Sequence, residues 1–218
     1  MVHGDGKTKK KTLADWLLEK YPAIKKVGEP MDINGKIIHR PGIVHRLDKE
    51  TSGVLVIAKN QKTLEELKEK FKERKVKKVY EAVVFGWLKD DKGRISASIG
   101  RSAKFGKFIA SRGKRGQLRE AITDYRVVKR FIDEKERKWT HVKVFPQTGR
   151  THQIRVHFNY LNHPVSCDKL YGGEKDCVTG LPRLALHASS IEFEIRGKKM
   201  AFVALPPPDF RKVLASAK

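Results

Sequence analysis

The residues best suited to chemistry lie between positions 41 and 53, in the sequence PGIVHRLDKETSG. Asp48 is at the centre of this stretch, and Arg46 precedes it by two residues. Turn-forming residues open and close the stretch, so we predict a polar loop that runs into an apolar strand over residues 54–58. Loops held on rigid elements commonly carry catalytic groups, which makes Asp48 a candidate nucleophile. The alternative is an ordinary turn in which the carboxylate only accepts hydrogen bonds from its own backbone.

Residues 45–53 resemble the signature loop of the pseudouridine synthases that modify structured RNA, in the branch typified by ribosomal large subunit pseudouridine synthase A. Two later stretches match the same branch in the same order, Lys78–Tyr80 and Gly149–His157, and Leu184–Ala188 also resembles it. The resemblance covers most of residues 40–206. Three motifs in the family's order are hard to reconcile with chance.

The resemblance implies an enzyme that isomerises specific uridines to pseudouridine in structured RNA, with large-subunit ribosomal RNA as the expected substrate. The reaction breaks the bond between ribose C1′ and N1, turns the uracil and joins C1′ to C5, and it needs no metal or other cofactor. Transfer RNA is the alternative substrate. A catalytically idle RNA-binding or ribosome-assembly protein is the alternative from a different class.

The same resemblance assigns the reaction to three residues. Asp48 matches the family aspartate, which adds covalently to the substrate or stabilises charge at C1′. Arg155 matches the arginine that pairs with this aspartate and keeps it ionised, because desolvation would otherwise raise its pKa. Tyr80 matches the tyrosine that stacks on the uracil and could take the C5 proton. From residue types alone, Tyr80 could be a core residue and Arg155 a surface residue.

Other matched positions are expected to bind RNA. Arg46 resembles the arginine that fills the space left by the extruded uridine, since a guanidinium can both stack and contact phosphate. His45 belongs to the same loop. Arg150 and His152, at the start of the third motif, are expected to bind phosphate or to pack the loop.

A cluster of cations without acids lies between Ile95 and Arg119, interleaved with two phenylalanines. Its members are Arg101, Lys104, Lys107, Arg112, Lys114, Arg115 and Arg119. These charges would repel one another without a partner, so we predict an arm that binds the RNA backbone. A merely solvated loop is the alternative.

Composition points to the same partner. The 218 residues include 48 Lys and Arg against 25 Asp and Glu, a formal net charge of +23. Such a balance favours a polyanion, and RNA is favoured over a membrane because no basic amphipathic helix, lipidation signal, secretory leader or membrane-spanning run is written in the sequence. We expect a cytoplasmic monomer.

The chain has two cysteines, Cys167 and Cys177. Two cysteines imply no disulfide framework, and a reducing compartment fits. A metal site built from them with His157 and His163 matches no zinc spacing, so we expect no metal and unligated structural cysteines.

The expected architecture is a single catalytic domain over residues 1–218, with residues 1–11 flexible and no separate N-terminal RNA-binding module. The resemblance implies an α+β fold with a bent, mainly antiparallel mixed sheet, a central cleft and flanking helices. Sequence patterns predict helices over residues 12–21, 60–74 and 150–162 and from Asp209, strands over 78–85, 121–131, 138–145, 184–195 and 200–205, a hairpin-like region over 95–119, and loop over 23–40.

Overall fold

The computed structural model describes residues 11–33, 36–102, 107–111, 117–173 and 177–216. The chain forms two compact units. The first comprises Met1–Lys49, Val54–Val76 and Glu192–Ala201, and the second comprises Glu50–Gly53, Lys77–Ile191 and Phe202–Lys218. The single-domain expectation stays a prediction, and most of the expected flexible segment 1–11 lies outside the described residues.

In the first unit, helix α1 (Leu13–Lys20) begins at a capping box. The Thr12 hydroxyl accepts a hydrogen bond from the Asp15 backbone N–H at 3.2 Å, and the Asp15 carboxylate accepts one from the Thr12 N–H at 2.8 Å. Both bonds satisfy backbone donors that a helix start leaves open. The predicted helix is confirmed. A short 3₁₀ helix (Pro22–Lys26) follows.

Helix α2 (Gln61–Lys72) also belongs to the first unit and confirms its prediction. The Asn60 side chain caps it by accepting from the Thr63 N–H at 2.9 Å. Leu64 and Leu67 are buried, whereas most of the other side chains are exposed or half-buried. Burial of one apolar stripe is what stabilises a helix of this composition.

The loop predicted over residues 23–40 is wrong in part. Strands β1 (Met31–Ile33) and β2 (Lys36–Ile38) form an antiparallel pair there. The signal for this pair is the dipeptide Asn34-Gly35, which favours tight hairpin turns and lies between two short segments with two apolar residues each. Three-residue strands are too short for alternation to reveal them.

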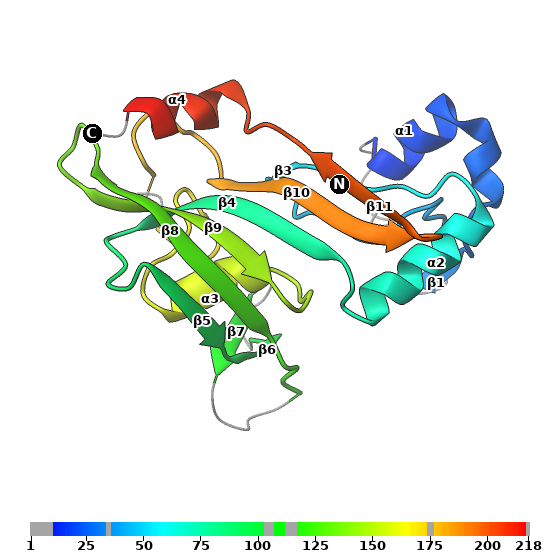
Figure 1. Cartoon of the computed structure of the whole chain (residues 1–218), viewed down its shortest axis with the longest axis horizontal. Coiled ribbons are helices and arrows are strands. Elements are labelled where there is room, and N and C mark those ends of the chain that lie inside the picture. Colours follow the sequence, from blue (N-terminus) through cyan, green and yellow to red (C-terminus); the bar gives the residue numbers. More distant parts are fainter. Residues whose placement is uncertain (1–10, 34–35, 103–106, 112–116, 174–176, 217–218) are drawn as a thin grey trace. The chain divides into compact units, whose positions relative to one another are not determined.

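The main sheet follows the order β11-β10-β4-β9-β8-β5. Figure 1 shows β4, β9 and β8 side by side. The bounds are β4 (Lys77–Phe85), β5 (Lys92–Ser96), β8 (Ile122–Ile132), β9 (Lys138–Pro146), β10 (Leu186–Ile195) and β11 (Lys198–Val203). Strand β3 (Ser52–Gly53) joins β10 in parallel, whereas β4, β9, β8 and β5 pair antiparallel. The predicted α+β class with a mainly antiparallel mixed sheet is confirmed.

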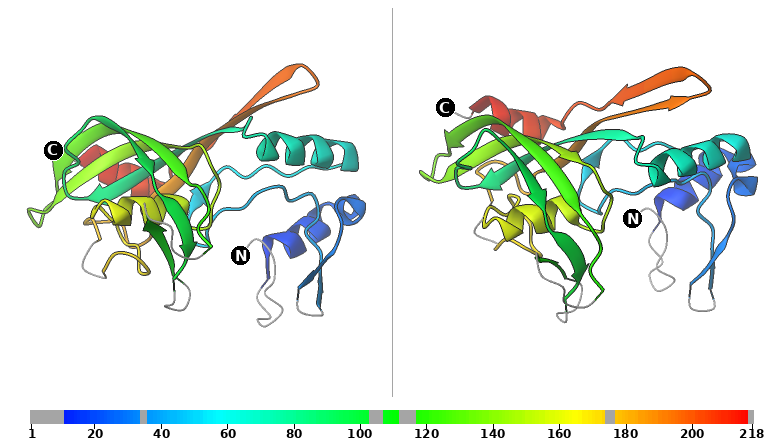
Figure 2. Two further views of the ribbon diagram at one scale, coloured as in Figure 1. Left: turned by 90° about the horizontal axis from the view of Figure 1, so that it is seen from below. Right: turned by 60° about the horizontal axis from the view of Figure 1, so that its bottom comes forward.

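Two helices and a separate hairpin complete the second unit. Strands β6 (Ser98–Arg101) and β7 (Phe108–Ser111) pair antiparallel, within the region predicted to be hairpin-like. Helix α3 (Gln153–Tyr160) contacts β7, β8 and β9 and lies, in yellow, on one face of the sheet in Figure 2. Helix α4 (Pro208–Ser216) confirms the terminal helix. No helix in the described ranges is long and apolar enough to cross a membrane.

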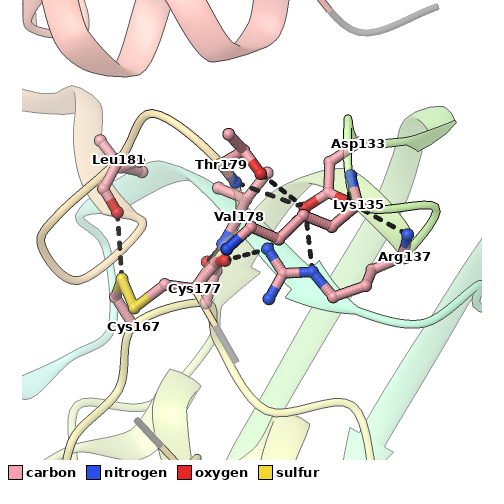
Figure 3. Close-up of polar contacts among 9 residues, drawn as sticks. Asp133, Lys135, Arg137, Cys167, Cys177, Val178, Thr179 and Leu181 are labelled. Carbon is pink, nitrogen blue, oxygen red and sulfur yellow. Dashed lines mark hydrogen bonds and ion pairs between the residues drawn. A yellow bond between two sulfur atoms is a disulfide. The ribbon is translucent and has the colours of Figure 1, made fainter. Parts of the chain in front are cut away.

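The prediction that the two cysteines are not linked is wrong. Cys167 and Cys177 form a disulfide with their Cα atoms 4.4 Å apart. A separation of ten residues along the chain does not reveal this proximity, which the fold creates. Figure 3 shows how the second cysteine is held: Arg137 donates to the Cys177 carbonyl at 2.6 Å and to Asp133 at 2.7 Å, and Asp133 also accepts from the Thr179 hydroxyl.

Candidate active-site residues

The residues that lead into the signature loop are held within the first unit. Gly42 has φ +64°, and a Cβ there would lie 2.1 Å from the Ala58 carbonyl oxygen. The Gly42 carbonyl accepts from the Ala58 N–H at 2.9 Å, and Ile43 forms an antiparallel bridge with Ile57. Only glycine fits both the backbone conformation and the close approach, so this residue determines where the loop begins.

The strand predicted over residues 54–58 is wrong. Within these residues, all of which the structure describes, no strand is present and a single bridge involves Ile57. The hydrogen bonds of the segment explain the difference. The Val56 N–H donates to the His45 side chain, and the Ala58 N–H donates to the Gly42 carbonyl. These backbone donors therefore bond to residues 42–45 and not to a neighbouring strand.

The His45 side chain packs within the first unit. Its Nε2 accepts from the Val56 N–H at 2.9 Å, and its ring stacks on Phe71 of α2 with centroids 5.0 Å apart. These contacts orient the loop relative to α2. A role of His45 in RNA binding stays a prediction.

Arg40 is a cationic residue near the loop that the sequence did not single out. Burial lowers the pKa of the Arg40 guanidinium, and the positive charge of Arg46 lowers it further. Arg46 is exposed and Asp48 is half-buried.

The end of the loop belongs to the second unit. Ser52 and Gly53 form β3 and pair with His187 and Ala188 of β10. Gly53 has φ +123°, and a Cβ there would lie 2.2 Å from the Ala188 carbonyl oxygen. The loop is thus anchored where it starts and where it ends, and both anchors require glycine.

Tyr80 lies on β4 opposite Val144 of β9, half-buried against the core of the second unit. Lys78 precedes it by two residues, so the two side chains share one face of the strand. Desolvation by burial lowers the pKa of the Lys78 ammonium. The stacking of Tyr80 on uracil stays a prediction, and Lys78 is a half-buried cation two residues away to which the motif match assigned no role.

Arg155 lies on α3 and forms a buried ion pair. Its Nε and Nη2 donate to the Asp168 carboxylate at 2.6 and 2.8 Å, and Asp168 is fully buried. Asp168 also accepts from the backbone N–H groups of Leu170 and Tyr171. The sequence offered no signal for Asp168 beyond an acid near a turn. Asp48 belongs to the first unit and Arg155 to the second, and their pairing stays a prediction.

Tyr171 connects Arg155 and His152 with Phe108 of β7, at the base of the predicted RNA-binding arm. The Tyr171 hydroxyl accepts from the Phe108 N–H of β7 and is hydrogen-bonded to His152 Nδ1, both at 3.0 Å. The His152 ring packs edge-on against Phe108, and the Arg155 guanidinium lies 5.2 Å from the Tyr171 ring centroid. His152 itself has φ +55°, which explains why the helix begins only at Gln153.

The other polar residues of the third motif have structural partners. Gln153 accepts from the Thr148 hydroxyl and the Arg150 N–H and donates to Thr123. His157 is fully buried, donates through Nε2 to the Ala97 carbonyl and accepts through Nδ1 from Thr123, and desolvation lowers its pKa. Arg150 donates to the Glu120 carbonyl at 2.9 Å. In the described ranges, no three His, Cys, Asp or Glu side chains gather to hold a metal.

The predicted RNA-binding arm is described in part. Arg101 of β6 and Arg119 are exposed, and Lys107 is half-buried. Lys104, Arg112, Lys114 and Arg115 lie outside the described residues. The base of the arm is held by the pairing of β6 with β7 and by the contacts of β7 with α3.

Solved structures share this fold. Human RNA Pseudouridylate Synthase Domain Containing 1 superposes with a TM-score of 0.73 at 28% identity, covering 93% of this chain and 78% of that one. Human RNA Pseudouridylate Synthase Domain Containing 4 superposes with a TM-score of 0.64 at 23% identity and adds support for the fold alone. The fold is that of a pseudouridylate synthase domain.

The sequence profile described as "RNA pseudouridylate synthase" matches residues 32–160, which include the signature loop, Tyr80 and Arg155. The chain belongs to this family. It is 39% identical to an "Uncharacterized RNA pseudouridine synthase" of Chlorobaculum parvum, over 86% of this chain and 61% of that protein. It is 35% identical to "Ribosomal large subunit pseudouridine synthase D" of Vibrio parahaemolyticus, over 96% of this chain and 62% of that protein. The chain thus spans less than two thirds of the length of these relatives.

Proposed function

We propose that the protein isomerises uridine to pseudouridine in structured RNA. The single observation that carries the proposal is the family match over residues 32–160, because this range contains the three residues that the chemistry requires. A protein that only binds RNA has no use for an aspartate, a tyrosine and an arginine at the positions of the family motifs.

In this proposal Asp48 is the nucleophile or charge-stabilising carboxylate, and Tyr80 stacks on the uracil and takes part in proton transfer at C5. Arg155 keeps Asp48 ionised in the closed complex. The target uridine must leave its stem, which costs a few kcal/mol, and Arg46 fills the vacated space. The anchors at Gly42 and Gly53 support this assignment, since they leave Asp48 on a short loop with both ends held.

The proposed substrate is large-subunit ribosomal RNA, and the proposed location is the cytoplasm. The substrate rests on the names of relatives from Vibrio parahaemolyticus, Borreliella burgdorferi and Pseudomonas aeruginosa, each called ribosomal large subunit pseudouridine synthase D. The net charge of +23 and the exposed Arg101 and Arg119 are consistent with binding to a phosphate backbone. The protein would act as a monomer and without a cofactor.

The test replaces Asp48 by asparagine, which keeps the size of the side chain and removes its charge. Turnover, measured by tritium release from labelled RNA, should be abolished, whereas filter binding should find RNA affinity largely unchanged. Glu50→Gln is the matched control because it removes an exposed carboxylate two residues away in the same loop, and it should retain turnover. Persistent turnover by Asp48→Asn would remove this residue from the role.

The substrate is tested separately by mapping pseudouridines in RNA from cells with and without the gene. Loss of a site in large-subunit ribosomal RNA is expected. Loss only in transfer RNA would assign the reaction to that substrate. An unchanged map, together with no tritium release by the wild-type protein, would leave an RNA-binding or ribosome-assembly role.

A further inference from the structure

A polar network around the buried side chain of His187 holds the end of the signature loop in the second unit. The Ser52 hydroxyl lies 2.9 Å from Nδ1 of His187, and Nη1 of Arg183 donates to the same hydroxyl at 3.3 Å. His187 is 1% exposed and its Nε2 lies 2.9 Å from the Ala204 carbonyl oxygen. The two contacts of Ser52 join it to residues more than 130 positions away in the sequence.

The partners determine which atoms of His187 carry hydrogen. A carbonyl oxygen can only accept, so Nε2 carries the hydrogen that is donated to Ala204. In the neutral ring Nδ1 is then an acceptor and receives the Ser52 hydroxyl hydrogen. The Ser52 oxygen remains available to accept from Arg183. The donors and acceptors of these three hydrogen bonds are thus mutually compatible, which a polar network needs to specify one geometry.

Helix α4 holds the other side of the network. Asp209, in its first turn, accepts from Arg183 Nε at 2.8 Å and from Nη2 at 3.0 Å. The next residue, Phe210, is fully buried, and its ring centroid lies 6.4 Å from that of His187. A bidentate pair orients a guanidinium plane strongly, so α4 determines the direction in which Arg183 presents Nη1 to Ser52.

We infer that Ser52, His187, Arg183 and Asp209 are positioning residues for the reaction of the signature loop. The main-chain pairing of β3 with β10 is only two residues long, and Ser52 is the fourth residue after Asp48. Such a short pairing holds a loop end weakly by itself, and the side-chain network supplies the remaining constraint. The inference rests on the proposed function, because it concerns where the loop presents Asp48.

A positioning role predicts a loss of rate without a loss of binding. Displacing a reacting group by about 1 Å can cost up to about 100-fold in rate. We therefore expect Ser52→Ala to lower kcat by about 10-fold or more, with KM and RNA affinity within about threefold of wild type. Ser52→Thr keeps the hydroxyl and should recover most of the rate.

Thr140→Val is the control for a merely structural effect. Thr140 is buried on β9, accepts from the Leu88 N–H and donates to the Gly86 carbonyl, so its replacement also removes two hydrogen bonds. It should lower Tm as much as Ser52→Ala or more while leaving kcat unchanged. Wild-type kcat in Ser52→Ala, a loss confined to KM, or an equal loss of kcat in Thr140→Val would each overturn the inference.

Two further measurements act on the network itself. His187→Gln can still donate to Ala204 but places no acceptor at Nδ1, so its effect on kcat should not add to that of Ser52→Ala in the double variant. Nitrogen-15 shifts of His187 at neutral pH should show hydrogen on Nε2, and hydrogen on Nδ1 would contradict the network. A wild-type protein that releases no tritium would refute the proposed function, and with it this inference, whereas an active wild type with a silent Ser52→Ala refutes the inference alone.

Discussion

Replacing Asp168 by alanine should destabilise the protein by about 4 kcal/mol. The carboxylate accepts two hydrogen bonds from Arg155, at 2.6 and 2.8 Å, and the two side chains are only 0% and 11% exposed. Removing one partner of a buried ion pair typically costs about 3–5 kcal/mol, because the remaining charge loses its compensation while staying out of water.

The backbone contacts of Asp168 place the estimate inside that range instead of below it. The N–H groups of Leu170 and Tyr171 lose their acceptor in the variant, at 3.0 and 3.1 Å. Both residues are half-buried, so water can replace part of what is lost. A chain of this size loses about 2–4 °C in Tm for each kcal/mol, which predicts a fall of about 8–16 °C.

Urea unfolding of the two proteins measures this difference directly, and Asp91→Ala is the matched control. Asp91 pairs with Arg130 at 2.7 Å but its side chain is 82% exposed. Exposed pairs contribute about 0–1 kcal/mol because water and salt screen them. If Asp168→Ala cost no more than Asp91→Ala, the argument that burial makes the Arg155 pair strong would be wrong.

Three further predictions follow from other contacts. Although burial opposes it, hydrogen bonds led by those of Arg137 hold the pKa of Asp133 well below its usual value. The contribution of Asp133 to stability is therefore present above the unfolded-chain pKa of about 3.9 and is lost as the pH falls towards the folded pKa. In urea unfolding between pH 5 and pH 2, the stability of Asp133→Asn should depend less on pH than that of the wild type, and an equal dependence would contradict the assignment. Reducing the disulfide should lower the unfolding free energy by up to about 3 kcal/mol, the loop-closure entropy for a sequence separation of 10. Dithiothreitol should leave the unfolding free energy of Cys177→Ser unchanged. If it also left that of the wild type unchanged, the bond would not stabilise the fold. Tyr80→Phe should keep RNA affinity but slow release of the isomerised product in a chase experiment, whereas equal rates would show that the aromatic ring alone suffices.

Local signals predicted much of the secondary structure. The capping box at Thr12 and the cap at Asn60 each use hydrogen bonds that span three residues, so the sequence contains all the atoms involved. Alternation predicted β4 because successive side chains of a strand face opposite sides. In the structure both sides of its second half are buried, since Ala82, Val83 and Val84 are each 0% exposed. These elements agree with the structure to within about two residues, the usual uncertainty of helix and strand ends.

Other elements have no local signal. The apolar run at 54–58 has strong β propensity, yet a strand requires a neighbouring ladder and the donors of Val56 and Ala58 bond to the loop. The disulfide depends on a turn that brings two cysteines together. Trp16 shares a face of α1 with Leu13 and Leu17 by its spacing, yet it is 45% exposed. Helical spacing defines a face without stating how far the neighbouring elements extend over it.

By itself, the amino-acid sequence determined the family, the order of the motifs, the basic charge and the loop that carries Asp48, since each of these is a property of residue types and their spacing. Only the tertiary structure decided that Arg155 binds Asp168 and that Ser52 meets His187 and Arg183. The physical reason is that side chains distant in sequence become neighbours through sheet register and helix packing, and these follow from burial of the whole core and not from any short stretch of the chain.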